Sequence, residues 1–449
     1  MQERLISKYS GAVPRYTSYP TAPHFHDGIA GDTYADWLQA LAPGQTLSLY
    51  IHIPYCDRLC WFCACHTRHT LKYEPITRYL EALYQEIAEV GARVSPQTRV
   101  TSLHLGGGSP TMLSPADMVT LVDRLRRAFT FAPDCEISVE MDPNDLDEGR
   151  YDALADIGLT RASLGVQDFD PKVQAVINRL QSFEQTAGVV EAVRARGVHS
   201  VNCDILYGLP HQTGESLTRT VEDILSLDPD RIALFGYAHV PWMKKHQQLI
   251  PETALPDARA RLEQAAIASD RLLAAGYEAI GIDHFAKPHD SLARAQRSGT
   301  LRRNFQGYTD DGADALIGLG ASSIGQLPQG YVQNMPATGE YERLATGSGI
   351  AVVRGIALDG EDRARAHVIE RIMCEFGFDF ADLARRHPDF AAMLIGEARM
   401  FAASDTDGIS EISNERFSVT PRGKPFTRSV AAAFDAYLGN GRGRHSIAV

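Results

Sequence analysis

Several features that would place the chain in a common class of proteins are missing. No stretch of about 18 uncharged apolar residues occurs, so no transmembrane helix is expected. The first residues, MQERLISK, hold no apolar run of the kind that forms a signal peptide. Basic residues number 44 and acidic residues 56, and the formal charge of −12 argues against a general nucleic-acid surface. We therefore expect a cytoplasmic protein that neither spans a membrane nor binds nucleic acid.

Familiar ligand-binding patterns are also absent. Residues 106–110 read GGGSP, which matches neither the GxxxxGK[ST] phosphate loop nor the GxGxxG dinucleotide pattern. A closed zinc site usually takes two cysteine pairs, and the sequence has no second pair. Disulfide frameworks belong to small secreted domains, whereas this chain has 449 residues, enough for two or three domains. Its 44% hydrophobic and 22% charged residues give an ordinary globular balance with ample material for a core.

The most informative segment is YIHIPYCDRLCWFCACHT at 50–67, which holds four of the seven cysteines. The first three have the spacing Cys56-x3-Cys60-x2-Cys63. An iron–sulfur cluster normally takes four protein sulfurs, so three thiolates on one loop would leave one iron without a protein ligand. A substrate can bind at such an open metal position. This segment predicts a redox enzyme, and the isolated Cys135, Cys203 and Cys374 are expected to be small buried hydrophobes.

Strands and helices are expected to alternate along the first 280 residues. Six short apolar or β-branched runs are predicted strands: 47–53, 100–105, 136–141, 160–166, 199–206 and 231–237. Amphipathic segments of helical length follow them at 74–94, 115–129, 145–157, 183–197, 214–227 and 257–275. This order predicts right-handed βαβ units and a parallel sheet. Six units are too few for a closed eight-fold barrel, which leaves a partial barrel or a doubly wound sheet.

Polar or glycine-rich residues follow the predicted strands. They are the cysteine loop, Gly106 to Pro110, Glu140 with Asp142, Gln167 with Asp168, Asp204, and Ala238 with His239. In parallel α/β barrels the chemistry gathers at the C-terminal ends of the strands. These ends would converge on one mouth, so a partial barrel with the cysteine loop at its open end is the simplest interpretation. Taken alone, the glycine run fits a tight turn equally well, and His52 fits a packed strand residue better than a ligand.

The alternation stops after about residue 350. Residues 360–449 are expected to be mainly helical, with the clearest helix at 361–376 and a short hairpin near Gly408 to Val419. We predict three parts: an N-terminal arm at 1–45, a barrel at 46–350 and a small, mainly helical C-terminal domain at 351–449. The arm, which contains Pro and Tyr, is expected to be extended and to help shield the site.

With these features the chain resembles the radical S-adenosylmethionine (SAM) enzymes. More narrowly, it resembles the oxygen-independent coproporphyrinogen III oxidases. The strings that carry the resemblance are YSGAVPRYTSYPTA at 9–22, GGGSPT at 106–111, EISVEMDP at 136–143, GVQDF at 165–169, DILYGLP at 204–210, YAHVP at 237–241, DHFA at 283–286, RNFQGYT at 303–309 and GLGASSIG at 318–325. They cover nearly the whole chain. The resemblance implies an α/β fold, the partial (β/α)6 barrel of the radical SAM type.

The resemblance also implies cofactors. Cys56, Cys60 and Cys63 match the ligands of a [4Fe-4S] cluster, and the amino and carboxylate groups of SAM would occupy the fourth iron. Residues that match SAM contacts, some of them to a second SAM, are Tyr50, Phe62, Gly107, Gly108, Ser109, Glu140, Gln167, Arg179, Asp204, Ala238 and Ile324. Ser109 stands where the family usually has Thr and keeps the hydroxyl. Cys65 matches a further cysteine of the subfamily and is too close to Cys63 to serve as another ligand without distorting the loop.

The activity implied by the resemblance is the anaerobic oxidative decarboxylation of coproporphyrinogen III to protoporphyrinogen IX in haem biosynthesis. A SAM-derived 5′-deoxyadenosyl radical would take hydrogen from the β-carbon of two propionates, each of which becomes a vinyl group. An electron donor and an electron acceptor, both unidentified, are implied, and we expect a monomer. The four substrate carboxylates call for cationic anchors. Candidates are Arg15, Lys244, Lys245, Arg302 and Arg303, each of which fits an exposed surface position equally well.

Three other functions stay open. A related haem chaperone would bind haem without decarboxylating a substrate; Cys65, the 9–22 arm and the 303–309 string argue against it. A haem-degrading radical SAM methyltransferase with a similar cysteine loop would transfer a methyl group and open the ring. A redox sensor would use the cluster without catalysis, and the many polar strand ends disfavour it because a sensor needs no deep substrate mouth.

Overall fold

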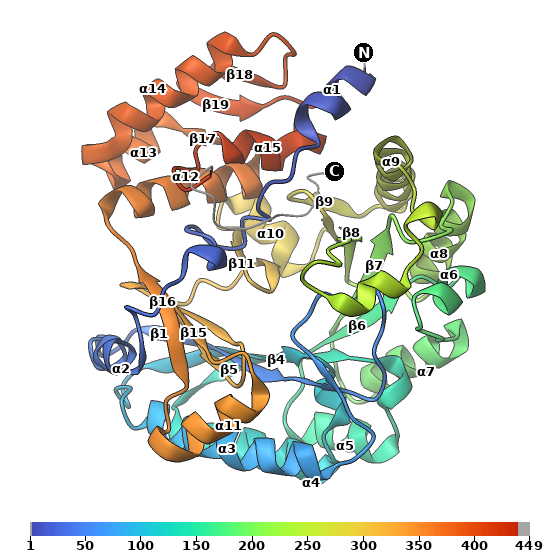
Figure 1. Ribbon diagram of the computed structural model, residues 1–449, viewed down its shortest axis with the longest axis vertical. Helices are drawn as coiled ribbons and strands as arrows, with labels where there is room; N and C mark the ends of the chain where they lie inside the picture. Colours follow the sequence, from blue (N-terminus) through green and yellow to red (C-terminus); the bar gives the residue numbers. More distant parts are fainter. Residues whose placement is uncertain (1, 439–449) are drawn as a thin grey trace.

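A curved, open sheet of twelve strands forms the centre of the molecule in this computed structural model, which describes residues 2–438 (Figure 1). Six parallel strands lie side by side in chain order: β1 (Thr46–Ile53), β4 (Arg99–Gly107), β5 (Phe131–Met141), β6 (Arg161–Gln167), β7 (Ser200–Tyr207) and β8 (Arg231–Gly236). These are the six strands that the sequence predicts. Because all six run in the same direction, their C-terminal ends meet at one edge of the sheet.

Helices follow these strands and cover the outer face of the sheet (Figure 1). They are α3 (Glu74–Gly91), α4 (Pro115–Ala128), α5 (Glu148–Asp156), α6 (Pro171–Val176), α7 (Phe183–Ala195), α8 (Gly214–Ser226) and α9 (Ala258–Ala274). Each packs through an apolar stripe; in α3 the buried stripe includes Ile76, Leu80, Leu83 and Ile87, spaced three or four residues apart. All six predicted helices are therefore present, and the short α6 is the one member of this set that was not predicted.

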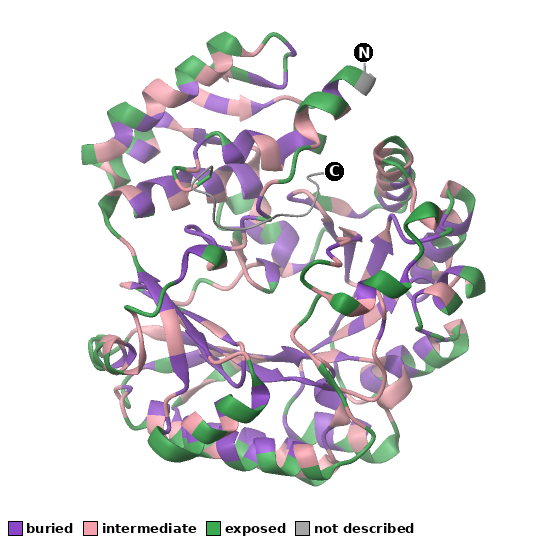
Figure 2. Ribbon diagram, in the orientation of Figure 1, coloured by how far each residue is buried: buried purple, intermediate pink, exposed green. Residues whose placement is uncertain are grey.

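The core lies between the sheet and these helices, where Figure 2 shows the strands to be mostly buried. Strand β1 illustrates the pattern, since Leu47, Leu49, Ile51 and Ile53 are all 1% exposed or less. Burying one such side chain contributes ~1.5–3 kcal/mol relative to leaving it exposed. The alternating residues of β1 face inward, and His52 among them is also buried.

The edges of the sheet are more elaborate than the sequence predicts. Next to β1 lies a seventh parallel strand, β13 (Ala315–Leu319), followed by the antiparallel β14 (Ile324–Leu327), β15 (Gly330–Asn334) and β16 (Val352–Ala357). The other edge ends in β10 (His284–Ala286) and β9 (Glu278–Ile280). The remaining barrel elements are α2 (Gly31–Gln39), β2 (Tyr55–Cys56), β3 (Arg68–His69), α10 (Ser291–Ser298), β11 (Arg302–Asn304), β12 (Gly307–Thr309) and α11 (Thr338–Ser348).

The C-terminal part of the chain packs around a separate core. It contains α12 (Gly360–Glu375), β17 (Gly377–Asp379), α13 (Phe380–Arg386), α14 (Pro388–Ser404), β18 (Ser410–Ser413), β19 (Arg416–Val419) and α15 (Thr427–Ala432). The helix predicted at 361–376 and the hairpin predicted near Gly408 to Val419 are both present. The three-part division of the chain stays a prediction, and the barrel sheet itself runs to Ala357.

The N-terminal arm lies against both the sheet and the C-terminal core. It begins with helix α1 (Gln2–Tyr9), drawn beside the C-terminal helices in Figure 1. Leu5, Tyr16 and Tyr19 of the arm belong to the same apolar cluster as Phe378 and Phe434. His26 forms an antiparallel bridge to Gly355 of β16. No helix in the described part of the chain is long and apolar enough to cross a membrane.

Candidate active site

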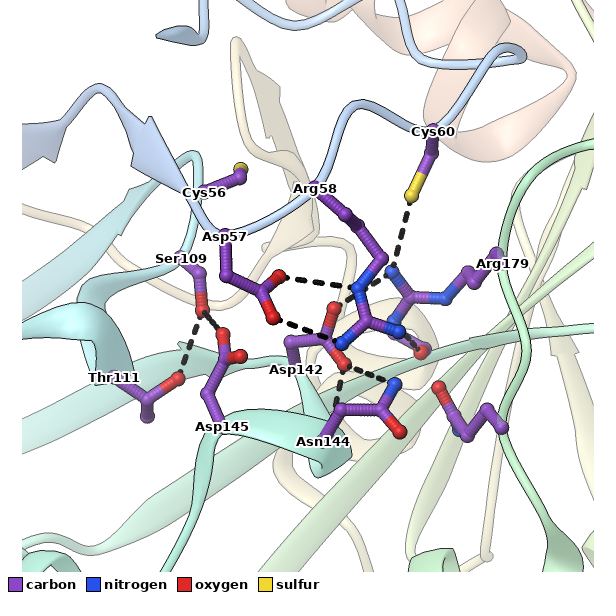
Figure 3. Close-up of polar contacts among 12 residues, drawn as sticks. Cys56, Asp57, Arg58, Cys60, Ser109, Thr111, Asp142, Asn144, Asp145 and Arg179 are labelled. Atoms are coloured by element: carbon purple, nitrogen blue, oxygen red, sulfur yellow. Dashed lines mark hydrogen bonds and ion pairs between the residues drawn. The ribbon is translucent and has the colours of Figure 1, made fainter. Parts of the chain in front are cut away.

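The cysteine loop projects from the C-terminal end of β1, at the mouth of the barrel. A short parallel ladder between β2 and β3, which pairs Tyr55 with Arg68, closes the base of this loop. The loop is fixed on one side by α6, because the Trp61 N–H donates to the Ile177 carbonyl at 2.9 Å. Figure 3 shows Cys56 and Cys60 on the loop above the ends of neighbouring strands. The loop is thus held at the place that the sequence predicts.

Each of the three cysteine sulfurs has a polar neighbour. Cys56 Sγ lies 3.0 Å from Thr67 Oγ1, Cys60 Sγ lies 3.6 Å from Arg179 Nη1, and Cys63 Sγ lies 3.4 Å from the backbone nitrogen of Cys65. The hydrogen bond from the Cys65 side chain lowers the pKa of Cys63 to about 7, so its thiolate is populated near neutral pH. Burial raises the pKa of Cys56 to about 12, and proton loss there must accompany metal binding.

The donor set fits an iron–sulfur cluster better than a single ion. All seven cysteines are free thiols. Within residues 2–438, no three His, Cys, Asp or Glu side chains come close enough together to hold one metal ion. A cluster has its irons at separate corners, so its thiolates lie farther apart than the ligands of one ion. Cys56, Cys60 and Cys63 would hold three of those irons, as the sequence predicts.

Charged groups lie directly beneath the loop (Figure 3). Arg179, whose side chain is 9% exposed, donates to Asp142 at 2.9 Å as well as contacting Cys60. Asp145 accepts a hydrogen bond of 2.7 Å from Ser109 Oγ, and burial raises its pKa to about 6. Arg179 and Ser109, two predicted cofactor contacts, are therefore held by carboxylates that close or follow β5.

A second network joins the ends of β1, β4 and β5. Glu140 accepts from the Gly107 N–H at 2.9 Å and from His104 Nε2 at 3.2 Å. Burial acts to raise the pKa of Glu140, but these hydrogen bonds and the His104 charge hold it below its usual range. The Tyr50 ring stacks on His104, and its hydroxyl forms a hydrogen bond with His52 Nδ1. The predicted contacts Tyr50, Gly107 and Glu140 are thus brought together.

The glycine run is explained by these close contacts. A Cβ on Gly106 would lie 2.9 Å from the Glu140 carboxylate. One on Gly108 would lie 2.6 Å from the Tyr55 carbonyl oxygen at the base of the cysteine loop. Gly107 adopts φ +118°, a conformation that L side chains rarely take. The run therefore lets the end of β4 pack against the cysteine loop, where the Gly108 and Ser109 N–H groups donate to the carbonyls of Ile53 and Tyr55 at 2.8 Å each.

Three more of the predicted SAM contacts lie on strands or at their ends. Gln167 ends β6 with φ +72°, an unusual backbone for a residue other than glycine. Asp204, on β7, accepts from Asn202 at 2.8 Å, and burial raises its pKa to about 6. Ile324 begins β14 at the same edge of the sheet, because β14 runs antiparallel to β13. Within residues 2–438, no hydrogen bond joins Gln167, Asp204 or Ile324 to the cysteine loop, and the roles of all these residues stay predictions.

A segment that follows β8 supports the cysteine loop and was not predicted from the sequence. Gln247, fully buried, donates to the carbonyls of both Phe62 and Ala238 at 2.8 and 3.1 Å. His246 contacts the Cys63 carbonyl at 2.7 Å, and Lys244 donates to the Cys65 carbonyl at 2.8 Å. The spacing of residues 244–247 gives no indication that they contact the cysteine loop, because their partners lie about 180 residues earlier in the chain. Lys244 therefore braces the loop, whereas the sequence offered it as a substrate anchor.

A cavity of about 900 Å³ opens beside this edge, between the barrel and the C-terminal core. Its lining includes Tyr207 and Tyr237 at the ends of β7 and β8, together with Arg15 of the arm and Arg303. The volume lies at the upper end of the ~300–1,000 Å³ typical of ligand pockets. Tyr237 precedes Ala238, and Gln247 donates to the carbonyls of both Ala238 and Phe62, so a wall of the cavity is linked to the cysteine loop.

Comparison with known proteins agrees with this geometry. Residues 50–224 match the model of the radical SAM superfamily. The chain is 48% identical to oxygen-independent coproporphyrinogen III oxidase of Paracoccus denitrificans, with 96% of each chain covered, and 47% identical to that of Bradyrhizobium diazoefficiens, with 97% of each covered. Among solved structures, coproporphyrinogen III oxidase from Escherichia coli, described as a radical SAM enzyme, is similar with a TM-score of 0.90, 37% identity, and 94% of this chain and 98% of that one covered.

These likenesses confirm the predicted family and the partial barrel of the radical SAM type. They extend over the arm, the barrel and the C-terminal part, since nearly the whole of each chain is covered. A [4Fe-4S] cluster and SAM follow from the family as cofactors. The chain belongs to the radical SAM superfamily and, within it, to the oxygen-independent coproporphyrinogen III oxidases.

Proposed function

We propose that the protein converts coproporphyrinogen III to protoporphyrinogen IX by anaerobic oxidative decarboxylation, as a step of haem biosynthesis. The observation that carries the proposal is the link, through Gln247, between the three-cysteine loop and a wall of the cavity of about 900 Å³, in a chain of this family. A redox sensor would have no use for a cavity of this size beside its cluster. The relatives' names favour decarboxylation over haem binding or methyl transfer.

The chain's own residues hold and shield the cofactors. Cys56, Cys60 and Cys63 would hold three irons of the cluster and would leave the fourth for SAM. When bound, cluster and SAM supply an organic radical able to take a hydrogen atom from an unactivated carbon. Arg179, which contacts Cys60, places a fixed positive charge beside a site that gains an electron. A second SAM is part of the proposal.

Two buried groups at the mouth of the barrel, His52 and Glu140, differ in their ionisation state. Burial lowers the pKa of His52 to about 4, so the ring is neutral at physiological pH; its Nδ1 accepts from the Tyr50 hydroxyl and its Nε2 donates to the His66 carbonyl. Glu140 stays ionised and fixes the N–H of Gly107. We propose that these two groups orient Tyr50 and the glycine turn toward the methionine end of SAM.

Each reacting propionate follows the same stoichiometry. Its β-carbon would give up one hydrogen atom to the radical that the cofactors supply, carbon dioxide would leave from the carboxylate, and one electron would pass to an acceptor. The side chain –CH2–CH2–COO⁻ thereby becomes –CH=CH2. Two rounds, on rings A and B, complete the reaction, and a separate donor reduces the cluster. We propose that the protein acts as a monomer in the cytoplasm.

The test is a reconstitution without oxygen. The chain with its cluster restored receives SAM, a chemical reductant and coproporphyrinogen III, and the tetrapyrrole is followed by mass spectrometry. We expect the loss of two carbon dioxide units with release of 5′-deoxyadenosine; the Cys60→Ser variant serves as the inactive control. Unchanged substrate together with tight haem binding would instead assign the chain to the related chaperones.

A further inference from the structure

We propose that four arginines facing the large cavity form one anion-binding subsite, which holds propionate carboxylates of the tetrapyrrole: Arg15, Arg261, Arg303 and Arg428. This inference rests on the proposed function, because it assigns the part of the molecule that would recognise that substrate. The sequence offered Arg15 and Arg303 as candidate anchors. It gave no indication of Arg261 or Arg428, and the other candidates do not line this cavity.

The first pair of arginines is attached to consecutive carbonyls at the end of β8. Arg15 Nη2 donates to the Gly236 carbonyl at 3.2 Å, and Arg261 Nη2 donates to the Tyr237 carbonyl at 2.9 Å. Arg15 comes from the arm and Arg261 from α9. Their guanidinium groups are therefore held close to one another although 246 residues separate them in the chain.

The second pair completes the group from two further segments. Arg428, on α15, donates to the arm carbonyls of Val13 and Pro14 at 2.5 and 3.1 Å. Arg303, on β11, lies with its guanidinium carbon 4.4 Å from the centre of the Tyr308 ring. The arm, the barrel and the C-terminal core thus each contribute a cation to one cavity.

Among the described residues, the cavity lining holds six arginine and lysine side chains against three carboxylates, Asp270, Asp283 and Glu375. The nearest acid to Arg303 is Asp283, at 3.8 Å, and Asp283 also bonds His284 at 2.6 Å. Arg15 and Arg261 donate to neutral carbonyls. Within residues 2–438, the Nε and Nη1 atoms of Arg303, whose side chain is 5% exposed, have no hydrogen-bond partner. Buried donors of this kind are costly to leave unpaired, so a ligand that accepts from them is expected.

The arginines also repel one another. Burial and the charges of Arg15 and Arg303 lower the pKa of Arg428 to about 10. Burial lowers the pKa of Arg15 as well; Asp283 opposes this effect and the neighbouring Arg303 adds to it. A chain with a formal charge of −12 has many acidic residues that could have compensated these cations. Their concentration in one cavity therefore favours binding of an anion with several charges.

The cavity presents apolar surface as well as charged groups. A Cβ on Gly208 would lie 2.4 Å from Arg261 Nη1, and one on Gly236 would lie 2.9 Å from Tyr207. These two glycines leave the room that the Arg261 side chain occupies. Apolar walls are provided by Tyr207, Phe235 and Ile282. A tetrapyrrole with carboxylate arms matches this combination of ring surface and guanidinium groups.

The test measures tetrapyrrole binding and does not depend on turnover. The probe is coproporphyrin III, the oxidised form of the substrate, which carries four carboxylates and cannot be decarboxylated by the same route. Its affinity for the reconstituted wild-type protein is compared with that of protoporphyrin IX, with two carboxylates, and of etioporphyrin, with none. We expect affinity to fall in that order, and to fall with added salt for coproporphyrin III.

Two variants locate the subsite. Arg261→Gln and Arg303→Gln should each weaken coproporphyrin III binding about tenfold or more and leave etioporphyrin binding unchanged. Arg271→Gln is the matched control, because Arg271 also lies on α9 but is exposed and pairs with Glu222. The melting temperature of Arg261→Gln should equal or exceed that of the wild type, since the change relieves repulsion among like charges. Arg303→Gln also removes the cation that faces the buried Asp283, so this variant should melt below the wild type.

The outcomes separate this inference from the proposed function. Equal affinity of the wild type for all three porphyrins, or unchanged affinity of both variants, would overturn the subsite even where the wild type decarboxylates its substrate. Carboxylate-dependent binding that both variants lose would support the subsite, and absence of decarboxylation in the wild type would then count against the proposed function alone.

Discussion

At the scale of single residues, the site depends on groups whose neighbours fix their ionisation. Cys63 receives a hydrogen bond from Cys65, which favours its thiolate, whereas Cys56 and Cys60 are buried thiols with raised pKa values. The three thiols therefore differ in pKa before any metal is bound. Their shared role as ligands, and the separate role of Cys65, can be tested by substitution.

We expect Cys65→Ser to retain the iron of the reconstituted cluster and each of Cys56→Ser, Cys60→Ser and Cys63→Ser to lose most of it. The reason is that Cys65 is exposed and lies two residues from Cys63, where it contacts that sulfur through its backbone N–H. Iron per chain and the visible absorbance of the cluster measure the result. Equal iron loss in Cys65→Ser would contradict the three-ligand assignment.

A second residue-scale prediction concerns pH. The pKa of His52 is about 4 in the folded protein, because of burial, against ~6.5 in an unfolded chain. A depressed folded pKa means that the unfolded chain binds the extra proton first as pH falls, so stability decreases from about pH 6.5 down to about pH 4. At most ~3 kcal/mol of stability is lost over that range.

The measurement is the difference in melting temperature between wild type and His52→Gln at several pH values. Gln keeps a donor for the His66 carbonyl but does not titrate. We expect the variant to lose less stability between pH 6.5 and 4 than the wild type, whereas the exposed His289→Gln should follow the wild type. Parallel curves for wild type and His52→Gln would contradict the prediction.

At the scale of elements, buried polar side chains join segments that sequence order keeps apart. Glu86 of α3, 1% exposed, accepts from the Gly320 N–H at 2.8 Å, from Asn334 at 2.5 Å and from the Tyr341 hydroxyl at 2.6 Å. Tyr79 of the same helix donates to the His52 carbonyl and accepts from the Ala321 N–H. Helix α3 thereby positions the turn that leads from β13 into Ile324.

Replacement of this carboxylate should be costly. In Glu86→Gln, the new amide group faces three donors, so at least one buried donor is left unpaired at ~1–3 kcal/mol. The exposed Glu340→Gln, whose partner Arg343 is also exposed, should change the free energy of unfolding by less than ~0.5 kcal/mol. Denaturant unfolding of the two variants gives the comparison, and equal stabilities would show that the network contributes little.

The packing of β4 against the cysteine loop makes a further prediction at this scale. Gly108→Ala places a Cβ against the backbone of Tyr55 and should destabilise the fold by ~1–3 kcal/mol and reduce iron retention. Gly188→Ala, in the middle of α7 with nothing within 4 Å, should instead stabilise the protein by ~0.5–1 kcal/mol. Melting temperature and iron content distinguish the two. A Gly108→Ala protein with normal iron would contradict the contact.

At the scale of the whole molecule, the arm connects the barrel to the C-terminal core. Asp407, whose side chain is 5% exposed, accepts from Lys8 at 2.5 Å and from the Tyr9 hydroxyl at 3.0 Å. Tyr16 donates to Asp435 at 3.0 Å. Because Arg15 lies between these anchors, attachment of the arm also positions one cation of the cavity.

We expect Asp407→Asn to loosen helix α1 without unfolding the barrel, since the variant loses the charged acceptor of Lys8. Amide hydrogen exchange of residues 4–10 should become faster, while exchange in β1 and β4 stays unchanged. Asp389→Asn, an exposed change on α14, serves as the control. Unaltered exchange in α1 of the Asp407 variant would show that apolar packing alone holds the arm.

Much of the parallel core could be predicted from the sequence because its signals are local. In each of the six strands and six helices, the apolar residues recur with the period of that type of element, as in β1 and α3. Strands β13 to β16 were not predicted, since they are short and no helix separates β13, β14 and β15. The pairing of β1 with β13 joins residues about 270 positions apart, which no local pattern records.

The same distinction applies to the site. By itself, the sequence determined the three-cysteine loop, the family and the strand ends at which polar residues collect, because these depend on spacing and on chain order. Only the tertiary structure decided that Gln247 braces the loop and that arginines 15, 261, 303 and 428 share one cavity. Their proximity arises when the arm, α9, β11 and α15 pack together, and packing between distant segments leaves no periodic trace in the sequence.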